Sequence, residues 1–501
     1  MENFSVWRDE VSGPSFPSLS GELEADVVIV GGGITGITAA YLLSIAGKSV
    51  VVLEALGVGQ SSTGYSTGNL YATVGGEGLH SISMKFNEAR LTEVVQSRAA
   101  AVDLIEEIIA VNGIECDFKR VPWSLFTVEG QRKSFVDKER TAAAAAGLTV
   151  LSEVPYTWPV ADGFTVPNQA QFNPLKYVVS LANKIESPTC RIFEHSRVTK
   201  VEEGDVCVVE TEAGRVRASN IIMATHTPKG LYMVHTSMGP YREYAVAALA
   251  KGSYPESGTY WEMQESEHYS IRTYDSPKGR IIMVLGEMHK VGQKEENLEC
   301  YEKLEAFLRK RFDVGEVVYK WSAQQYKPAD SIPYIGLSSG NSKTYIATGF
   351  AADGLTYGTL AAMIISDAIL IKPNPWSKTY EASRITPLAS ASNFLKENVN
   401  VAYELVKDLL TTDADSFKEV RTYEGKIMEL EGSKYAVHRD GEGELHIVIA
   451  ICPHMGCVVH WNTAEQSWDC PCHGSRFSKD GEVLEGPAIN PLKKVSAAGK
   501  Q

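Results

Sequence analysis

Apolar positions near the start of the chain are arranged as a strand, a turn, a helix and a second strand. Residues 26–30 form a short run rich in β-branched side chains, and residues 49–53 form another. Between them lie a glycine-rich segment and a helix-like stretch at residues 37–46. Short runs of Val and Ile next to glycine are typical of buried parallel strands. We therefore expect an α/β unit built on a parallel sheet.

The turn of this unit has the spacing G-x-G-x-x-G, formed by Gly31, Gly33 and Gly36. Such glycines allow a tight turn, a close approach of a pyrophosphate to the backbone and close packing of helix on strand. The N-terminus of the helix then faces the phosphates. Glu54 ends the second strand, where its carboxylate can accept hydrogen bonds from ribose hydroxyls. The unit therefore predicts a bound dinucleotide, with a generic strand, turn and helix as the plainer alternative.

Alternating strands dominate the middle of the chain, and shorter strands its end. The middle strands are expected at residues 241–249, 259–263, 269–274 and 280–285. A proline-punctuated connector follows at residues 372–415, with a helix-like stretch at 393–410. Beyond it, a small antiparallel sheet is expected from runs at residues 425–430, 434–438 and 445–451.

Length and charge narrow the class of protein. The 501 residues suit two or three domains, and the formal net charge is −14. An acidic chain lacks the basic face that nucleic acid or an anionic membrane requires. The first ten residues do not resemble a signal peptide, and the most apolar stretch, residues 360–371, is too short to span a bilayer. We expect no nucleic acid partner, no stable membrane insertion and a cytoplasmic location, with the cysteines outside residues 452–472 as buried free thiols.

Two cysteine-histidine loops near the end of the chain predict a metal centre. Cys452 and His454 form a C-x-H pair, and Cys470 and His473 form a C-x-x-H pair. Two thiolates and two imidazoles can hold a two-iron cluster, with the thiolates on one iron and the imidazoles on the other. A Cys2His2 zinc site is the alternative, because it also takes four ligands in two pairs. Zinc does not account for the further cysteine in each loop.

The two loops resemble those of Rieske [2Fe-2S] domains. The resemblance implies Cys452, His454, Cys470 and His473 as cluster ligands. It also implies a disulfide bond between the two remaining cysteines, Cys457 and Cys472. The fold implied is a small all-β domain over residues 416–501, after a linker at residues 372–415.

Four further segments resemble the FAD-dependent oxidoreductases of the D-amino-acid oxidase superfamily: residues 57–70, 221–226, 330–336 and 349–358. The resemblance implies a Rossmann-type α/β FAD-binding domain, of the glutathione-reductase-like kind, joined to an α+β substrate domain within residues 1–371. The FAD-binding parts are expected at about residues 24–80, 165–230 and 325–371, and the substrate domain at about 81–164 and 231–324. The residues implied in FAD binding are Gly31, Gly33, Gly36, Glu54, Gly64, Thr67, Ala224, Gly349, Gly354, Leu355 and Thr356.

The middle strands should supply the substrate contacts. Arg272 could pair bidentately with a substrate carboxylate, although an arginine on an edge strand is often solvated. His289 and Lys290 lie in a segment that resembles a turn of the family, and either could act as a base or as a cation near the flavin. These three residues are the candidate catalytic residues.

Together, the two resemblances imply an FAD-dependent oxidoreductase with a covalently linked Rieske cluster. We expect oxidation of an amine, amino acid or N-methyl substrate, with electron transfer between flavin and cluster and with an unidentified electron donor or acceptor outside the chain. The alternatives are a redox sensor without enzymatic activity, a nicotinamide-dependent reductase, and a flavin and iron-sulfur reductase fed by an external donor.

Overall fold

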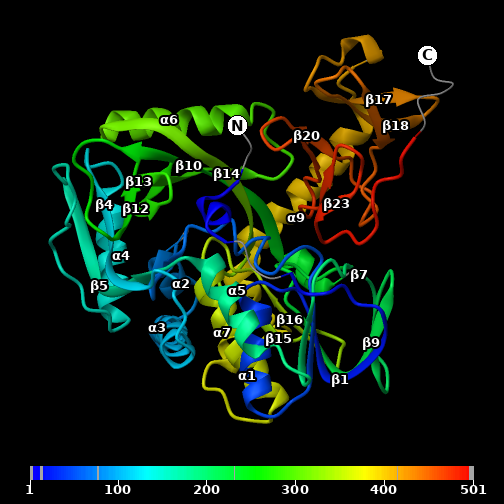
Figure 1. The fold of residues 1–501 in the computed structure, drawn as a ribbon. Helices are drawn as coiled ribbons and strands as arrows, with labels where there is room; N and C mark the ends of the chain where they lie inside the picture. Colours follow the sequence, from blue (N-terminus) through cyan, green and yellow to red (C-terminus); the bar gives the residue numbers. More distant parts are fainter. Residues whose placement is uncertain (1–3, 12–14, 76–77, 231, 415, 496–501) are drawn as a thin grey trace.

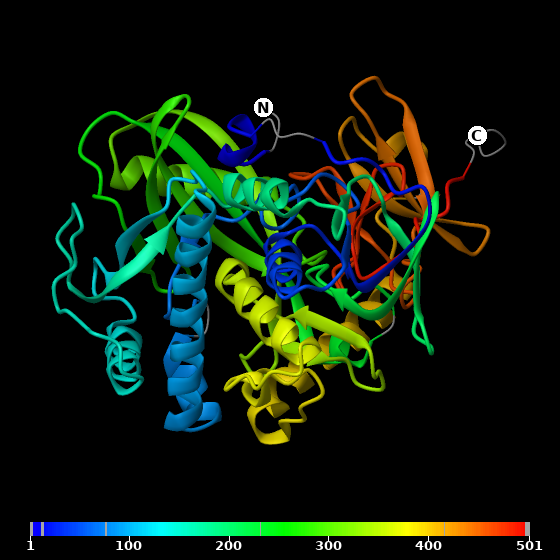
Figure 2. The ribbon, with the colours of Figure 1, turned by 60° about the horizontal axis from the view of Figure 1, so that its bottom comes forward.

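The computed structural model describes residues 4–11, 15–75, 78–230, 232–414 and 416–495. These residues form two eight-stranded sheets, one three-stranded sheet and one four-stranded sheet. In both ribbon views the C-terminal strands, orange to red, lie at the opposite end of the molecule from β4 and β5, in cyan (Figures 1 and 2).

The first large sheet contains the predicted α/β unit. Strand β1 pairs in parallel with β2 on one side and with β9 on the other, and helix α1 packs against α7 and α5. The order along the sheet is β15-β16-β9-β1-β2-β6, with the β7-β8 hairpin attached at β9. The strands are β1 (Gly21–Val30), β2 (Val50–Leu53), β6 (Cys190–Phe193), β7 (Val198–Glu202), β8 (Cys207–Thr211), β9 (Gly214–Met223), β15 (Tyr334–Leu337) and β16 (Thr344–Thr348).

The second large sheet contains the predicted middle strands. Its order is β14-β10-β13-β12-β11-β4-β5-β3, and β10 pairs antiparallel with both β13 and β14. Strands β3 and β5 also belong to this sheet. From the sequence, all residues of β3 and most residues of β5 are expected in the FAD-binding parts. The strands are β3 (Asn69–Leu70), β4 (Lys119–Thr127), β5 (Asp162–Gln171), β10 (Met238–Ala250), β11 (Thr259–Met263), β12 (His268–Ser276), β13 (Gly279–Lys290) and β14 (Val314–Pro328).

Helices cover these sheets and lead to the C-terminal domain. The α-helices are α1 (Ile34–Ile45), α2 (Gly78–Lys85), α3 (Glu88–Asn112), α4 (Lys133–Ala145), α5 (Pro174–Ile185), α6 (Leu298–Arg311), α7 (Gly354–Ile369), α8 (Ser377–Tyr380) and α9 (Pro387–Leu410). Proline at the first turn starts α9 inside the predicted connector, several residues before the expected helix. Within the described residues, none of the helices has the length and apolar character needed to cross a membrane.

The C-terminal domain is antiparallel throughout and packs on the second large sheet. Strands β17 (Gly425–Leu430), β18 (Ser433–Arg439) and β19 (Leu445–Ile449) form one sheet, and β20 (His460–Asn462), β21 (Ser467–Asp469), β22 (Arg476–Ser478) and β23 (Val483–Glu485) form the other. Arg242 on β10 is 2% exposed and donates to Glu465 at 2.8 Å. Tyr301 on α6 donates to the same carboxylate at 2.9 Å. Buried charge-assisted bonds of this kind fix the position of the domain.

Candidate functional site

The glycines of the first turn are required by close backbone contacts. Gly31 has φ +109°, and a Cβ there would lie 2.4 Å from the carbonyl oxygen of Ala224. A Cβ on Gly36 would lie 1.9 Å from the carbonyl oxygen of Gly31. Both distances are shorter than any side chain permits, so α1 can approach β1 only with glycine at these positions. The predicted role of these two glycines in the turn agrees with this geometry.

Glu54 lies next to the turn because β1 and β2 run parallel in register. Val30 is level with Leu53, so the residues that follow them meet at the same edge of the sheet. One oxygen of Glu54 accepts a hydrogen bond from the amide of Gly32 at 2.7 Å, and the other accepts from Leu56 at 2.8 Å. Burial raises the pKa of this carboxyl, while these bonds oppose the rise.

A large cavity begins at this edge of the first sheet and reaches the second sheet. Its volume is about 1730 Å³, its opening included. Residues of both large sheets line it, from the glycine turn and Glu54 to β10 and β14. The predicted residues that line it are Gly31, Gly33, Glu54, Thr67, Ala224, Gly354 and Leu355. The other predicted FAD residues, Gly36, Gly64, Gly349 and Thr356, lie outside this lining.

Helix α7 begins at the wall of the cavity. Gly349, with φ +78°, directly follows β16. Gly354 and Leu355 open the helix and line the cavity. The first amides of a helix have no partner within it and carry the positive end of its dipole. Such amides stabilise negative charge on a group bound in the cavity.

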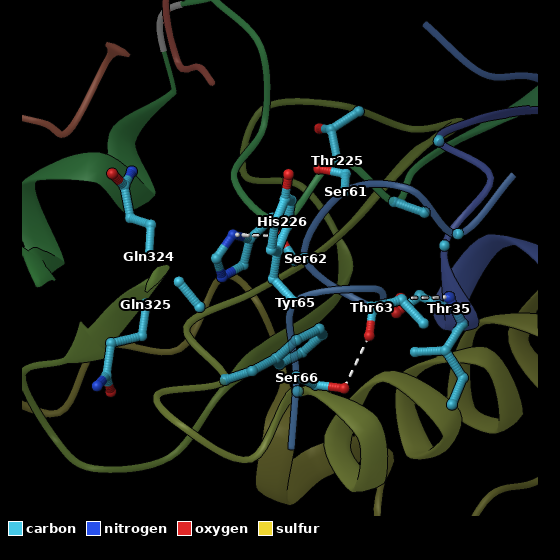
Figure 3. A pocket seen from close by; sticks show the side chains of 18 of the residues that line it. Thr35, Ser61, Ser62, Thr63, Tyr65, Ser66, Thr225, His226, Gln324 and Gln325 are labelled. Atoms are coloured by element: carbon cyan, nitrogen blue, oxygen red, sulfur yellow. Dashed lines mark hydrogen bonds between the residues drawn. The ribbon is translucent and has the colours of Figure 1, made fainter. Parts of the chain in front are cut away.

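The opposite wall contains residues that the sequence did not single out. His226 accepts or donates a hydrogen bond with Ser62 at 3.1 Å. On β14, Gln324 and Gln325 both line the cavity, and their side chains point in opposite directions (Figure 3). Glu243 on β10 lines the same part. Glu243, Gln324 and Gln325 lack a local motif, because the adjacent antiparallel strands β10 and β14 bring them together, whereas His226 ends the segment 221–226 that resembles the family.

The two predicted metal-binding loops converge in the C-terminal domain. The thiols of Cys452 and Cys470 are within hydrogen-bond reach of each other. The rings of His454 and His473 have their centroids 5.0 Å apart. A disulfide bond joins the remaining two cysteines, Cys457 and Cys472, the pairing that the resemblance implies. These two therefore offer no thiolate, and the two thiols and two imidazoles stay the predicted ligand set.

The polar atoms of this set fit a [2Fe-2S] cluster. Nδ1 of His473 is buried and has no hydrogen-bond partner within the described residues, as expected of a nitrogen reserved for iron. Burial, and then the neighbouring His454, lower the pKa of His473 to about 4, so the imidazole is in the neutral form that binds metals. Backbone amides of both loops donate to the two thiols. Such donors stabilise the negative charge of cluster sulfurs.

The cluster loops contact the wall of the large cavity. Nε2 of His454 lies 3.2 Å from the carbonyl oxygen of Gly230, directly after the lining residue Lys229. Gly230 donates in turn to the carbonyl oxygen of Pro487 at 3.0 Å. From the C-terminal domain, Leu484, Ala488 and Ile489 line the cavity itself. The dinucleotide site and the cluster site therefore share a wall.

Two aromatic side chains fill the space between the sites. The ring of His235, in η2 (Met233–Ser237), lies 5.2 Å from that of His454 and 6.4 Å from that of His473. Burial is the main cause that lowers the pKa of His235 to about 3, so it is neutral. Tyr326 on β14 donates to the carbonyl oxygen of Gly486 at 2.9 Å. Its ring lies 5.0 Å from that of His226 in the cavity wall.

The three candidate catalytic residues lie outside the lining of the cavity. Arg272 is buried, donates to the carbonyl oxygen of Thr67, and stacks on Trp7 and Tyr274. The remaining two are placed by other contacts: His289 bonds with Tyr244 at 3.1 Å, and Lys290 pairs with Glu397 of α9 at 2.6 Å. Their catalytic role stays a prediction from the sequence that has no geometric support.

Two family models match successive parts of the chain. The model of the family described as FAD dependent oxidoreductase matches residues 26–368, and that of the Rieske [2Fe-2S] domain matches residues 412–496. A relative in Bacillus subtilis (strain 168), named as the Rieske 2Fe-2S iron-sulfur protein YhfW, is 32% identical over 502 residues. The match covers 98% of this chain and 97% of the relative.

Solved structures share the fold of the part of the chain that precedes the C-terminal domain. Glycine oxidase from Geobacillus kaustophilus matches with a TM-score of 0.57 at 16% identity, over 72% of this chain and 100% of that one. L-Amino acid deaminase from Proteus myxofaciens matches with a TM-score of 0.59 at 15% identity, over 77% of this chain and 98% of that one. At this level of identity, the likeness concerns the fold alone.

Proposed function

Since this chain belongs to the FAD-dependent oxidoreductase family and carries a Rieske [2Fe-2S] domain, we propose that it oxidises a C–N bond of a small amine or amino-acid-like substrate and moves the electrons between flavin and cluster inside one molecule. Its cofactors are FAD and the Rieske cluster. The choice of a C–N bond is supported by the fold shared with glycine oxidase and L-amino acid deaminase.

The shared wall between the two sites is the observation that carries the proposal. Gly230 links the cavity to His454 by one hydrogen bond, and Ala488 of the cluster domain lines the cavity directly. His235 packs against both ligand imidazoles. This contact favours electron transfer between the cofactors without a separate carrier.

The reaction balances with water as the co-reactant. When bound, FAD takes a hydride from carbon and gives up electrons singly, and the cluster takes them one at a time. A secondary amine and one water then yield a carbonyl compound, a smaller amine, two protons and two electrons. The amides at the start of α7 would stabilise the negative charge that develops nearby. The electrons leave to an external acceptor.

An anaerobic screen of amines, N-methyl compounds and amino acids tests this function. We expect at least one of these classes to bleach the flavin absorbance of the full-length protein and then to change the absorbance of the cluster. The order of the two changes gives the direction of electron flow. Bleaching only by reduced nicotinamide, with none of the three classes active, would contradict C–N oxidation and favour a reductase.

A further inference from the structure

We infer that the substrate enters the cavity as a cation, and that the carboxylate of Glu243 holds its ammonium group. This inference rests on the proposed function and names the substrate class of the same site. It is carried by the position of one buried carboxylate, by the neutral groups around it, and by where the positive charges of the cavity lie.

Glu243 faces the cavity because of the alternation of side chains along β10. Its neighbour Arg242 points to the other face of the sheet and pairs with Glu465 of the cluster domain at 2.8 Å. Successive residues of a strand point to opposite faces. Glu243 therefore points away from the cluster domain; it is only 4% exposed and belongs to the cavity lining.

The carboxylate meets two neutral groups. One of its oxygens accepts a hydrogen bond from the side-chain amide of Gln325 at 3.0 Å. The other lies 4.0 Å from Nε2 of His268. Burial, followed by the charge of Lys327, lowers the pKa of His268 to about 4, so this imidazole carries no charge at neutral pH. The Lys327 ammonium itself lies over the ring of Tyr241, 4.7 Å from its centre. Lys327 also acts on Glu243 electrostatically but lies outside the cavity lining, so a cation bound in the cavity would be the direct charge partner of this buried carboxylate.

The positive charges of the cavity lie at its other end. The Lys and Arg residues of the lining are Arg197 and Lys229. Arg197 acts electrostatically on Glu54, next to the glycine turn, and Lys229 is influenced by Arg197 and Glu54. Where β10, β13 and β14 line the cavity, Glu243 is the charged residue of the described lining. A substrate carboxylate at this end would be repelled by the negative charge of Glu243, and the described lining there has no arginine that could pair with it. This arrangement selects against substrates that carry a carboxylate.

An aromatic residue, Tyr71, lies within electrostatic range of Glu243 in the same cavity. Tyr71 lines the cavity, and its hydroxyl donates to Asp353 at 2.6 Å, which fixes the ring. Asp353 also pairs with Arg98 at 3.2 Å, so its own charge is balanced. Ammonium groups with apolar substituents bind well between a carboxylate and an aromatic face. The site therefore suits a primary, secondary or tertiary amine without a neighbouring carboxylate.

Glu243 also suits the proton balance of the reaction. An ammonium must lose a proton before its nitrogen can assist the departure of a hydride from the adjacent carbon. The Glu243 carboxylate would accept that proton from the nitrogen, and bound FAD would supply the hydride acceptor. Burial raises the pKa of Glu243 to about 7, opposed by the charge of Lys327, so it can hold the proton near neutral pH.

Binding of a cation that cannot react tests the inference. Tetramethylammonium has no nitrogen proton or lone pair, so it reports binding alone. We expect it to perturb the flavin spectrum of the FAD-loaded full-length protein in a saturable manner, with acetate giving no such change. In Glu243→Gln the affinity for tetramethylammonium should fall about 10- to 100-fold, because a charge-assisted contact is lost. Glu267→Gln removes a neighbouring carboxylate outside the lining and should change the affinity less than about twofold.

Two further measurements keep the test decisive. Glu243→Asp retains the charge and should recover part of the affinity, which separates loss of charge from loss of fold. The affinity of the wild type should rise with pH up to about 7 and then level, because the carboxylate must be ionised and the probe does not titrate. The groups that face Glu243 are His268, Glu267 and Lys327 from the sheet and Asp353 from the start of α7. Of the sheet groups, His268 has a pKa near 4 and does not produce this profile.

The outcomes separate this inference from the proposed function. Equal affinity in wild type and Glu243→Gln, or binding of acetate in preference to tetramethylammonium, would overturn the inference even if amines reduce the flavin. Binding of tetramethylammonium that depends on Glu243, with no reduction by any amine or amino acid, would support the cation site and reject C–N oxidation.

Discussion

Replacing His473 by alanine is expected to remove the [2Fe-2S] cluster while FAD stays bound. The imidazole is buried, and its Nδ1 has no hydrogen-bond partner within the described residues. We assign this nitrogen to the iron. Its loss leaves two thiolates and one imidazole, which cannot complete the two-iron site. The FAD cavity draws most of its lining from the first half of the chain, with Leu484, Ala488 and Ile489 from the cluster domain. We therefore expect the electron-spin signal of the reduced cluster to vanish and the flavin content per chain to be unchanged.

His460→Ala is the matched control for this variant. His460 lies on β20 in the same domain and outside the ligand set, so its loss should leave both cofactors in place. A Rieske signal that persists in His473→Ala would show that another residue ligates the iron. Joint loss of FAD and cluster in His473→Ala, but not in His460→Ala, would show that the FAD site depends on the cluster more strongly than its lining suggests.

Replacing Gly36 by alanine is expected to weaken FAD binding. The added Cβ would lie 1.9 Å from the carbonyl oxygen of Gly31, and that obstacle is backbone, which cannot move aside alone. Insertion of a methyl group into a packed site costs about 1–3 kcal/mol, and more when the backbone must shift. Since 1.4 kcal/mol corresponds to a factor of ten, FAD affinity should fall at least about tenfold. Purified protein should carry less flavin per chain than the wild type and unfold at a lower temperature.

Gly204→Ala serves as the control for the glycine turn. A Cβ on Gly204 would meet the carbonyl oxygen of Val206 at 3.5 Å, an ordinary contact, and the residue lies in the β7-β8 hairpin away from the cavity lining. This variant should keep FAD. Full flavin content in Gly36→Ala would mean that the turn tolerates a side chain, and the argument from close packing would be wrong.

Features set by neighbours along the chain could be predicted from the sequence, and those set by the packing of distant segments could not. The glycine turn and the two metal-binding loops are local motifs, in which spacing determines geometry. By contrast, Gly230 and His454 are 224 residues apart. Their contact depends on how the C-terminal domain packs on β10 and β14. No pattern in the sequence reports such packing.

Arg272 and Glu243 illustrate the same limit within one sheet. Both are charged residues on predicted strands, and chemistry alone favoured Arg272 as the substrate contact. The structure stacks Arg272 on Trp7 and directs it to the backbone of Thr67, whereas Glu243 lines the cavity. The strand register decides which face each side chain occupies, and a change of one residue would exchange the two faces.

Strand β14 explains how one sheet serves two sites. Gln324 donates to the carbonyl oxygen of Gly474 in the cluster loop at 2.7 Å, and Tyr326 donates to Gly486 on the same side. Gln325, between them, points to the opposite face and donates to Glu243. The proposed substrate site at Glu243 and the cluster loops therefore lie on opposite sides of this strand, with the dinucleotide cavity reaching both.

Flash reduction of the flavin in the full-length protein tests the central claim most directly. A light pulse, with a sacrificial donor and without oxygen, reduces the flavin, and the cluster absorbance is then followed at several protein concentrations. Electron transfer inside one molecule predicts that the cluster is reduced at a rate independent of protein concentration. A cluster that stays oxidised, or a rate proportional to protein concentration, would contradict the account.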